Sequence, residues 1–129
     1  MTALMGATPI AMIGCGLSDT VPGTVAWHVI AMYAPSLALA GFRSVRPRRL
    51  TIAGCAFVAA AGILFLLPGT TGSFSASAVT LGVGWSLVTL GTTLWIHEDG
   101  EPSRLLLGFY DAALLGAALL GALAANFVS

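Results

Sequence analysis

The chain has 129 residues, of which 57% are hydrophobic and 8% are charged, and its formal net charge is zero. A soluble globular domain carries about 25% charged residues, and a nucleic-acid-binding domain concentrates basic residues on one face. The composition therefore excludes a soluble domain and argues against a nucleic-acid partner. Together with a mean hydropathy of +0.96, it predicts an all-α integral membrane protein, a bundle of five transmembrane helices in the lipid bilayer.

Five apolar segments are separated by short polar loops, and a membrane span needs about 20 residues. We predict helices over residues 1–17, 22–41, 50–67, 75–96 and 103–127, which form one transmembrane helical domain over 1–129. The first segment contains Pro9. At about 1.5 Å per residue it reaches about 25 Å, which is short of a hydrocarbon core of about 30 Å. The N-terminus lacks the basic region of a cleavable signal peptide.

One loop is strongly basic. It holds four of the five Lys and Arg residues, namely Arg43, Arg46, Arg48 and Arg49. Because basic loops stay in the cytoplasm, we place this loop there. Alternation of the five spans then puts the N-terminus and the loop at Arg104 inside and the C-terminus at Ser129 outside. The expected location is the inner membrane of a bacterium.

Small residues recur at close spacing in the last two helices, where they let helix backbones approach each other. In the fourth helix these residues are Gly82, Gly84 and Gly91, and in the fifth they are Ala112, Gly116, Ala117, Gly121 and Ala125. We interpret both sets as packing faces, although glycines in the fourth helix could instead flank a substrate path. Cys15 and Cys55 are too far apart for a CxxC site, and we interpret both as buried small hydrophobic residues.

Two pairs of soft ligands stand four residues apart, Met1 with Met5 and His28 with Met32. On a helix, residues at this spacing share one face. Thioether and imidazole donors on two neighbouring helices suit Cu(I), so these four residues form a candidate metal site. The alternative is that the methionines fill gaps in the packing and that His28 makes one hydrogen bond to a neighbouring helix. No other cofactor is indicated.

Asp111 is the one acidic residue well inside an apolar segment. An ionisable group there costs at least about 2.5–3.5 kcal/mol unless it is paired or hydrated, which favours a functional role. A structural hydrogen bond to a neighbouring helix is the equal alternative. The acids of the preceding loop, Glu98, Asp99 and Glu101, are expected to be solvated.

Several segments occur in an order typical of a known family. They are residues 8–12, 28–36, 81–87, 91–94 and 101–111. In this order they resemble the seventh to eleventh helices of a bacterial major facilitator superfamily transporter, over nearly the whole chain. The resemblance implies half of a transporter bundle without its first six helices or its twelfth. Since alternating access needs two halves that move against each other, we do not expect a complete transporter.

Within that superfamily, the Met1–Met5 and His28–Met32 pairs are similar to the MxxxM and HxxxM motifs of the CcoA-like copper importers. The resemblance implies that these residues handle copper during uptake. The family's cytoplasmic loop normally carries an Asp in a Gly…Asp-Arg-x-Gly-Arg pattern. Residues 41–49 keep the arginines but contain no acid, so the gating contact of that Asp is expected to be lost.

Three functions compete. The preferred one is a half-transporter-like protein that serves as a structural or accessory subunit of a larger membrane complex. The second is Cu(I) binding or uptake, as an oligomer or with a missing half, and the third is a transporter fragment without function. The expected partners are lipid and either other membrane subunits or further copies of the chain. GxSxG, HExxH and P-loop motifs are absent from the sequence, so we expect no enzymatic activity.

Overall fold

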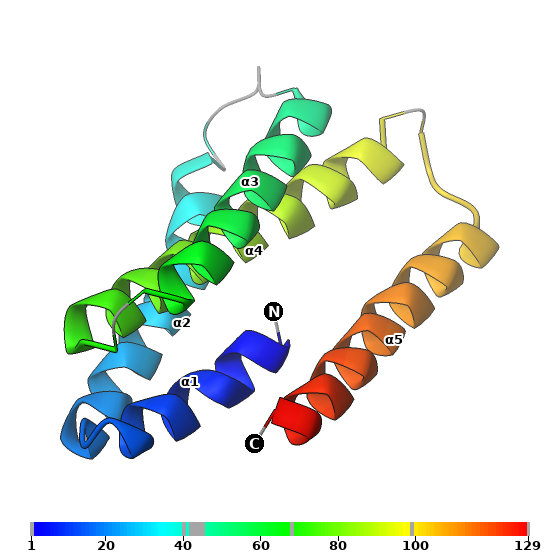
Figure 1. The fold of residues 1–129 in the computed structure, drawn as a ribbon. Coiled ribbons are helices and arrows are strands. Elements are labelled where there is room, and N and C mark those ends of the chain that lie inside the picture. The colour runs from blue at the N-terminus through cyan, green and yellow to red at the C-terminus, as the bar shows by residue number, and fades with distance from the viewer. Residues whose placement is uncertain (1, 40, 42–45, 68, 99, 129) are drawn as a thin grey trace.

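The computed structural model describes residues 2–39, 41, 46–67, 69–98 and 100–128, with side chains for all of these except 2, 121, 122 and 124–128. Throughout the described residues the regular structure is helical, and it comprises five α-helices and one 3₁₀ turn (Figure 1). The α-helices are α1 (Thr2–Gly14), α2 (Val21–Leu39), α3 (Pro47–Phe65), α4 (Thr71–Ile96) and α5 (Arg104–Val128), and the 3₁₀ turn is η1 (Ser18–Thr20). The all-helical prediction is therefore confirmed for this part of the chain.

The end of α1 lies three residues before the expected residue 17. Gly16 has a φ of +75°, a left-handed conformation that glycine adopts without strain. The amide of Gly16 donates to the carbonyl of Ile13 at 3.0 Å. The amide of Leu17 donates to the carbonyl of Met12 at 2.8 Å. Together these two bonds form a Schellman motif, which ends the helix.

The starts of α3 and α4 also lie earlier than expected. Pro47 is the first residue of α3, a position where its missing N–H costs nothing. Before α4, Thr70 and Ser73 form a capping box: the Ser73 amide donates to Thr70 Oγ1 at 3.2 Å, and the Thr70 amide donates to Ser73 Oγ at 3.1 Å. The segment that we expected to be a turn is thus the beginning of a helix.

Two helices, α3 and α4, are long and apolar enough to cross a membrane, as judged over the described residues. The apolar helix α1 has only 13 residues, which corresponds to about 20 Å. The 19-residue helix α2 contains His28, Pro22 and Pro35 and is not one of these two candidate spans. Membrane spans are supported for α3 and α4, and the crossing of α1, α2 and α5 stays a prediction.

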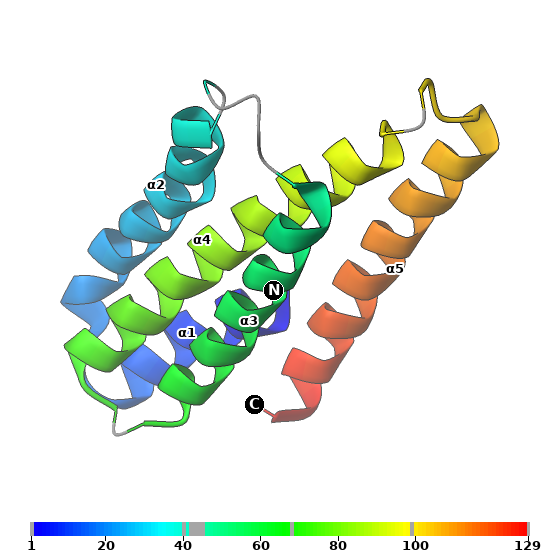
Figure 2. The same cartoon turned by 90° about the horizontal axis from the view of Figure 1, so that it is seen from above.

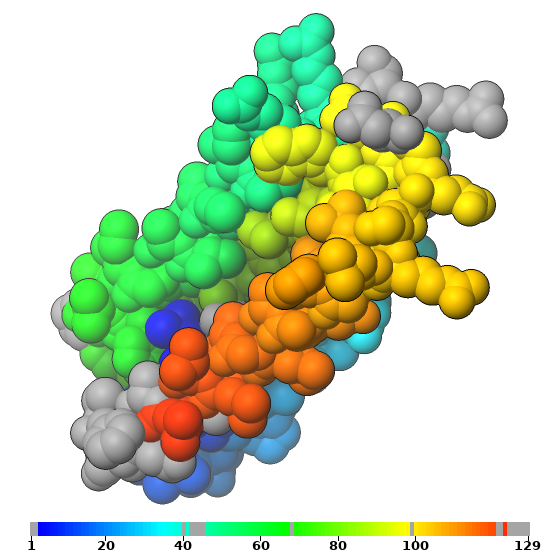
Figure 3. Space-filling model, turned by 90° about the vertical axis from the view of Figure 1, so that its right-hand side faces the viewer, coloured from blue at the N-terminus to red at the C-terminus, as the bar shows by residue number. Residues whose placement is uncertain are grey.

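Helix α4 is the centre of the molecule, with α3 packed along one side and α2 along another. Both views show α5 apart from these three helices (Figures 1 and 2). Within the chain, α5 contacts mainly α1. From the side, α5 forms a ridge across the front of the molecule (Figure 3). The fold therefore consists of a tightly packed group, α2–α3–α4, and a loosely attached α5.

Glycines carry the close contacts of α4, as predicted. A Cβ atom on Gly84 would lie 2.9 Å from the amide nitrogen of Val58 in α3, and one on Gly91 would lie 2.7 Å from that of Thr51. On the side toward α2, a Cβ on Gly82 would lie 2.7 Å from the carbonyl oxygen of His28. A side chain at any of the three would push the helices apart.

The predicted packing face of α5 shows no such close contact at the positions whose surroundings the structure describes. A Cβ atom on Gly116 would meet no atom within 4 Å, and Ala112 and Ala117 are exposed. The surroundings of Gly121 and Ala125 lie outside the description. Ala112, Gly116 and Ala117 are therefore available for contacts beyond this chain, and that use stays a prediction.

The prediction that both cysteines are buried is wrong. Cys15 and Cys55 are exposed within the chain. Gly54 faces α4, where a Cβ would lie 2.6 Å from the amide nitrogen of Val88. Because neighbouring positions on a helix point about 100° apart, Cys55 is turned away from that contact.

The α2–α3 and α4–α5 connections lie at the same end of the molecule (Figure 1). Arg46, Arg48 and Arg49 at the start of α3 are therefore at the same end as Arg104 at the start of α5. Arg43 lies outside the described residues. This arrangement is the one that alternating spans predict, and the assignment of this end to the cytoplasm stays a prediction.

Candidate functional site

His28 joins α2 to α4. Its side chain is 3% exposed, and Nδ1 lies 2.6 Å from the carbonyl oxygen of Ala78. Since a carbonyl only accepts, Nδ1 carries the proton and donates, which leaves Nε2 as an acceptor. One turn earlier, Thr24 Oγ1 and Ser75 Oγ are 3.1 Å apart. The interhelical hydrogen bond of His28, which was the alternative to metal binding, is thus present.

The four predicted copper ligands have different surroundings. Met1 lies outside the described residues, Met5 is partly buried on α1, and Met32 is partly buried on α2. His28 retains only Nε2 for a metal. Within the described residues, no group of three or more His, Cys, Asp and Glu side chains could hold a metal ion. A Cu(I) site that uses the methionines stays a prediction.

Helices α2 and α4 run in the same direction and diverge toward their C-terminal ends (Figure 2). Their contacts pair Thr24 with Ser75 and His28 with Ala78, and the next turn brings Gly82 against Met32. Past this point the two helices line a cleft of about 350 Å³ that is open on one side, with a volume close to the lower end of the range for small-molecule sites, about 300–1,000 Å³. The cleft is lined by Met32, Tyr33, Ser36, Trp85, Ser86, Thr89, Leu90 and Thr93.

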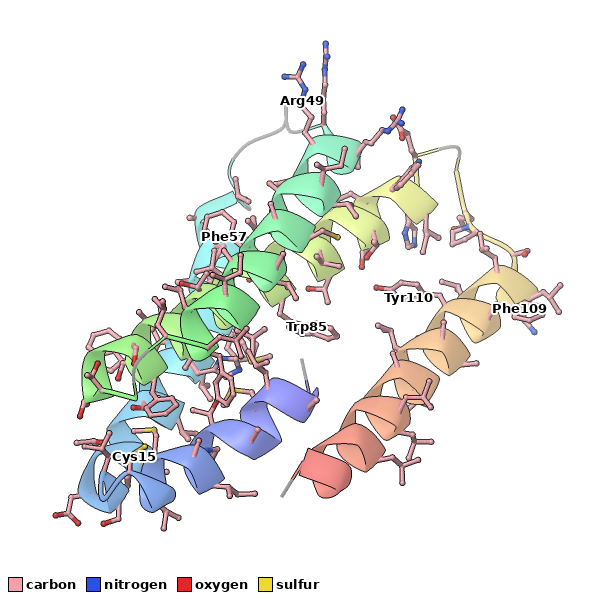
Figure 4. The ribbon with its side chains drawn as sticks, in the orientation of Figure 1. Cys15, Arg49, Phe57, Trp85, Phe109 and Tyr110 are labelled. Atoms are coloured by element: carbon pink, nitrogen blue, oxygen red, sulfur yellow. The ribbon has the colours of Figure 1, made fainter. Side chains whose placement is uncertain are left out.

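The lining combines aromatic rings with hydroxyl groups. Tyr33 comes from α2, and Trp85 projects from the middle of α4 (Figure 4). None of the described lining residues is charged. A lining of aromatic rings and hydroxyls favours an uncharged solute with a planar or apolar part over a free ion, whose lost hydration it would compensate less well.

Ser86 is the unusual residue of this cleft. It is 3% exposed, and its hydroxyl has no hydrogen-bond partner in the part of the chain that the structure describes. A buried polar group without a partner costs about 1–3 kcal/mol. Sequence reasoning missed Ser86, which contributed only to the resemblance of residues 81–87. An isolated serine in an apolar helix is usually satisfied by its own helix, so the sequence carried no signal.

Asp111 does not belong to the cleft. It is exposed on α5, while its neighbour Tyr110 places its hydroxyl 3.0 Å from Thr92 Oγ1 on α4. Figure 4 shows Tyr110 directed toward α4 and Phe109 directed away from it. The polar link between α4 and α5 is therefore made by Tyr110, and a functional role of Asp111 stays a prediction.

Two helices thus have the length and composition of membrane spans, and an uncharged cleft lies beside the central helix. The chain is similar to a curated bacterial transporter, the Riboflavin transporter RfnT of Brucella anthropi, with 34% identity over 107 residues. The match covers 81% of this chain and 27% of the relative, so the chain spans about a quarter of that protein. No family profile matches the chain, and no solved structure matches it significantly.

The similarity supports a transporter-like membrane protein, and a transporter as relative is consistent with the expectation of no enzymatic activity. It supports the resemblance to a membrane transporter that was stated above. Membership of the major facilitator superfamily and likeness to copper importers stay predictions.

Proposed function

We propose that this chain forms part of a membrane transporter and that the cleft between α2 and α4 is where it binds a small uncharged solute. The observation that carries the proposal is the lining of this cleft, in which the aromatic rings of Trp85 and Tyr33 stand beside serine and threonine residues and no described lining residue is charged. The similarity to a transporter adds to it.

The chemistry of the lining favours a planar ring that carries hydroxyl groups. Trp85 and Tyr33 offer aromatic faces, and Ser36, Thr89 and Thr93 offer hydroxyls. Riboflavin, the solute in the name of the relative, is an uncharged planar ring system with a hydroxylated chain. We propose riboflavin, or a solute of the same shape and polarity, as the ligand of the cleft.

The proposed transporter includes more than the described helices. Because alternating access requires two halves around a central site, we propose that further membrane helices, from another subunit or another copy, cover the open side of the cleft. We also propose the bacterial inner membrane as its location, with the N-terminus inside and the C-terminus outside. A purely structural accessory role and copper handling find no support in the contacts or in the comparisons and stay predictions.

The proposal is tested by measuring riboflavin binding to the purified chain in lipid nanodiscs by equilibrium dialysis. We expect saturable binding that weakens at least fivefold in Trp85→Ala, because stacking on an aromatic side chain contributes about 1–3 kcal/mol. Trp27→Ala is the matched control, since Trp27 is an exposed residue of α2 that does not line the cleft. Absence of saturable binding, or equal losses in the two variants, would contradict the proposal.

A further inference from the structure

Hydroxyl groups line the cleft along its length, and they differ in what each can offer a solute. Five of the described lining residues carry one, namely Tyr33, Ser36, Ser86, Thr89 and Thr93. Ser36 Oγ donates its proton to the carbonyl of Tyr33 at 2.7 Å. Thr89 Oγ1 donates to the carbonyl of Trp85 at 2.9 Å. Since a hydroxyl has one proton and two lone pairs, Ser36 and Thr89 keep acceptor capacity only. The hydroxyl oxygen of Ser86 is fully buried, so a solute in the cleft does not reach it.

Thr93 and Tyr33 carry the two hydroxyls that stay open to a solute. Both residues are exposed, and neither hydroxyl has a hydrogen-bond partner among the described residues. A threonine inside a helix often donates to a carbonyl of its own helix, as Thr89 and Thr92 do. Thr93 departs from this pattern, so its hydroxyl keeps its proton as well as its lone pairs.

The cleft wall that α4 provides changes from aromatic to polar along the helix. Trp85, Thr89 and Thr93 are four residues apart, so they share one face of α4, and all three line the cleft. At 1.5 Å per residue, Trp85 and Thr93 are about 12 Å apart along the helix axis. An aromatic ring and an open hydroxyl therefore mark the two ends of the cleft.

The opposite wall, which α2 provides, ends before Thr93. The two side-chain hydrogen bonds between α2 and α4 join residues 51 and 50 positions apart, so an α2 residue lies level with the α4 residue about 50 positions later. By this register Tyr33 lies within a turn of Trp85, whereas Leu39, the last residue of α2, lies before the level of Thr93. The inner end of the cleft thus has a helix on both sides, and at the outer end α2 no longer supplies one.

From this order we infer that the ligand lies in the cleft in one orientation, with its planar ring against Tyr33 and Trp85 and its hydroxylated chain directed toward Thr93. Thr93 is the specificity-determining residue for the chain, because its hydroxyl can donate to a hydroxyl there or accept from it. The hydroxyl of Tyr33, at the inner end, is left for the polar edge of the ring. The inference rests on the proposed function and adds which end of the ligand meets which end of the cleft.

The opposite orientation would satisfy the ligand less well. It would place the planar ring beyond the last turn of α2, where neither Tyr33 nor Trp85 can stack on it. The hydroxyls of the chain would meet the aromatic rings at the inner end, and they would leave Thr93 without a partner. Stacking and hydrogen bonding therefore favour the same orientation.

The experiment measures the affinities of riboflavin and lumichrome for the chain in nanodiscs. Lumichrome keeps the ring carbonyls and nitrogens of riboflavin but lacks its hydroxylated chain. We expect Thr93→Val to weaken riboflavin binding about fivefold, because it removes one hydrogen bond to the ligand, and to leave lumichrome binding unchanged. Trp85→Ala should weaken both compounds by a similar factor, because both stack on the indole ring.

Two further variants serve as controls. Thr93→Ser keeps the hydroxyl and should retain the affinity for riboflavin within about twofold. Thr92→Val changes the adjacent residue, which does not line the cleft and whose hydroxyl lies 3.0 Å from that of Tyr110. It should leave the affinities for both compounds unchanged.

Each contrary result has a distinct meaning. If the wild-type chain binds riboflavin and Thr93→Val binds it equally well, the inference about Thr93 is wrong while the proposed site stands. The same holds if Thr93→Ser loses as much affinity as Thr93→Val. If Thr93→Val weakens lumichrome as much as riboflavin, Thr93 meets the ring, and the inferred orientation is wrong. If the wild type binds neither compound, the proposed function fails, and the inference fails with it.

Discussion

Helices α4 and α5 carry similar small-residue patterns but use them differently. In α4, Gly84 and Gly91 touch the backbone of α3 so closely that a Cβ atom would lie under 3.0 Å from an amide nitrogen. In α5, a Cβ on Gly116 would meet nothing within 4 Å. Small residues permit close approach but do not attract a particular neighbour, because lipid gives no hydrophobic driving force between helices. The comparison teaches that such a pattern identifies a possible interface and not its occupant.

The largest loss of stability is expected at a glycine of α4 that touches α3. Gly84→Val should destabilise the fold by about 3 kcal/mol, because the new side chain meets the α3 backbone, which cannot rotate away. Gly116→Val is the matched substitution in open space and should change stability by less than about 0.5 kcal/mol. Unfolding in mixed detergent, followed by circular dichroism, measures both. Equal losses would show that α5 is packed as tightly as α4 and would remove the contrast.

The second-largest loss of stability is expected at the contact between α2 and α4. His28→Ala removes the buried hydrogen bond to Ala78 and should cost about 2 kcal/mol, since the bond and the packing of the ring are both lost. His97→Ala is the control, because the side chain of His97 is exposed and, among the described residues, its ring bonds to the carbonyl of Thr93 in its own helix. The same unfolding assay separates them. The copper prediction is tested separately by a Cu(I) competition titration on His28→Ala and Met32→Ala. If both variants retain copper as well as the wild type does, that prediction is wrong.

The smallest effect is expected at the link to α5. Tyr110→Phe removes only the hydroxyl that meets Thr92, so stability should fall by about 1 kcal/mol. The position of α5 should become less defined, which spin-label distances between α4 and α5 would record as a broader distribution. Phe109→Leu alters an exposed side chain on the opposite side of α5 and should leave the distribution unchanged. A narrow distribution in Tyr110→Phe would mean that other contacts hold α5.

Local sequence signals predicted most of the helices. The basic loop and the apolar runs indicate where helices lie, because each acts through the residues next to it. Three boundaries were misplaced. The predicted start of α3 at residue 50 overlooked Pro47, its first residue. The predicted end of α1 at residue 17 overlooked the left-handed Gly16, which closes the Schellman motif. Thr70 and Ser73 looked like a turn, because a capping box with serine at its third position is a weak pattern.

The candidate site was much less predictable. The need of His28 for a partner was evident from its apolar surroundings, but the identity of Ala78, 50 residues away, depends on how α2 and α4 pack. Ser86 gave no signal, since the lack of a partner is a property of its three-dimensional surroundings. The resemblance of several segments to a transporter indicated the class. The substrate depends on which side chains meet across the diverging helices, and sequence periodicity does not specify that.

The contact between His28 and Ala78 also sets an order on biosynthesis. Synthesis proceeds from the N-terminus, so α2 is made before α4 exists and carries an imidazole without its acceptor. The α3–α4 hairpin has a short connection and glycine contacts between neighbouring helices, so its pairing is local in sequence. The acceptor of His28 lies 50 residues further along the chain. The hairpin therefore does not depend on α2, whereas the contact of His28 depends on α4.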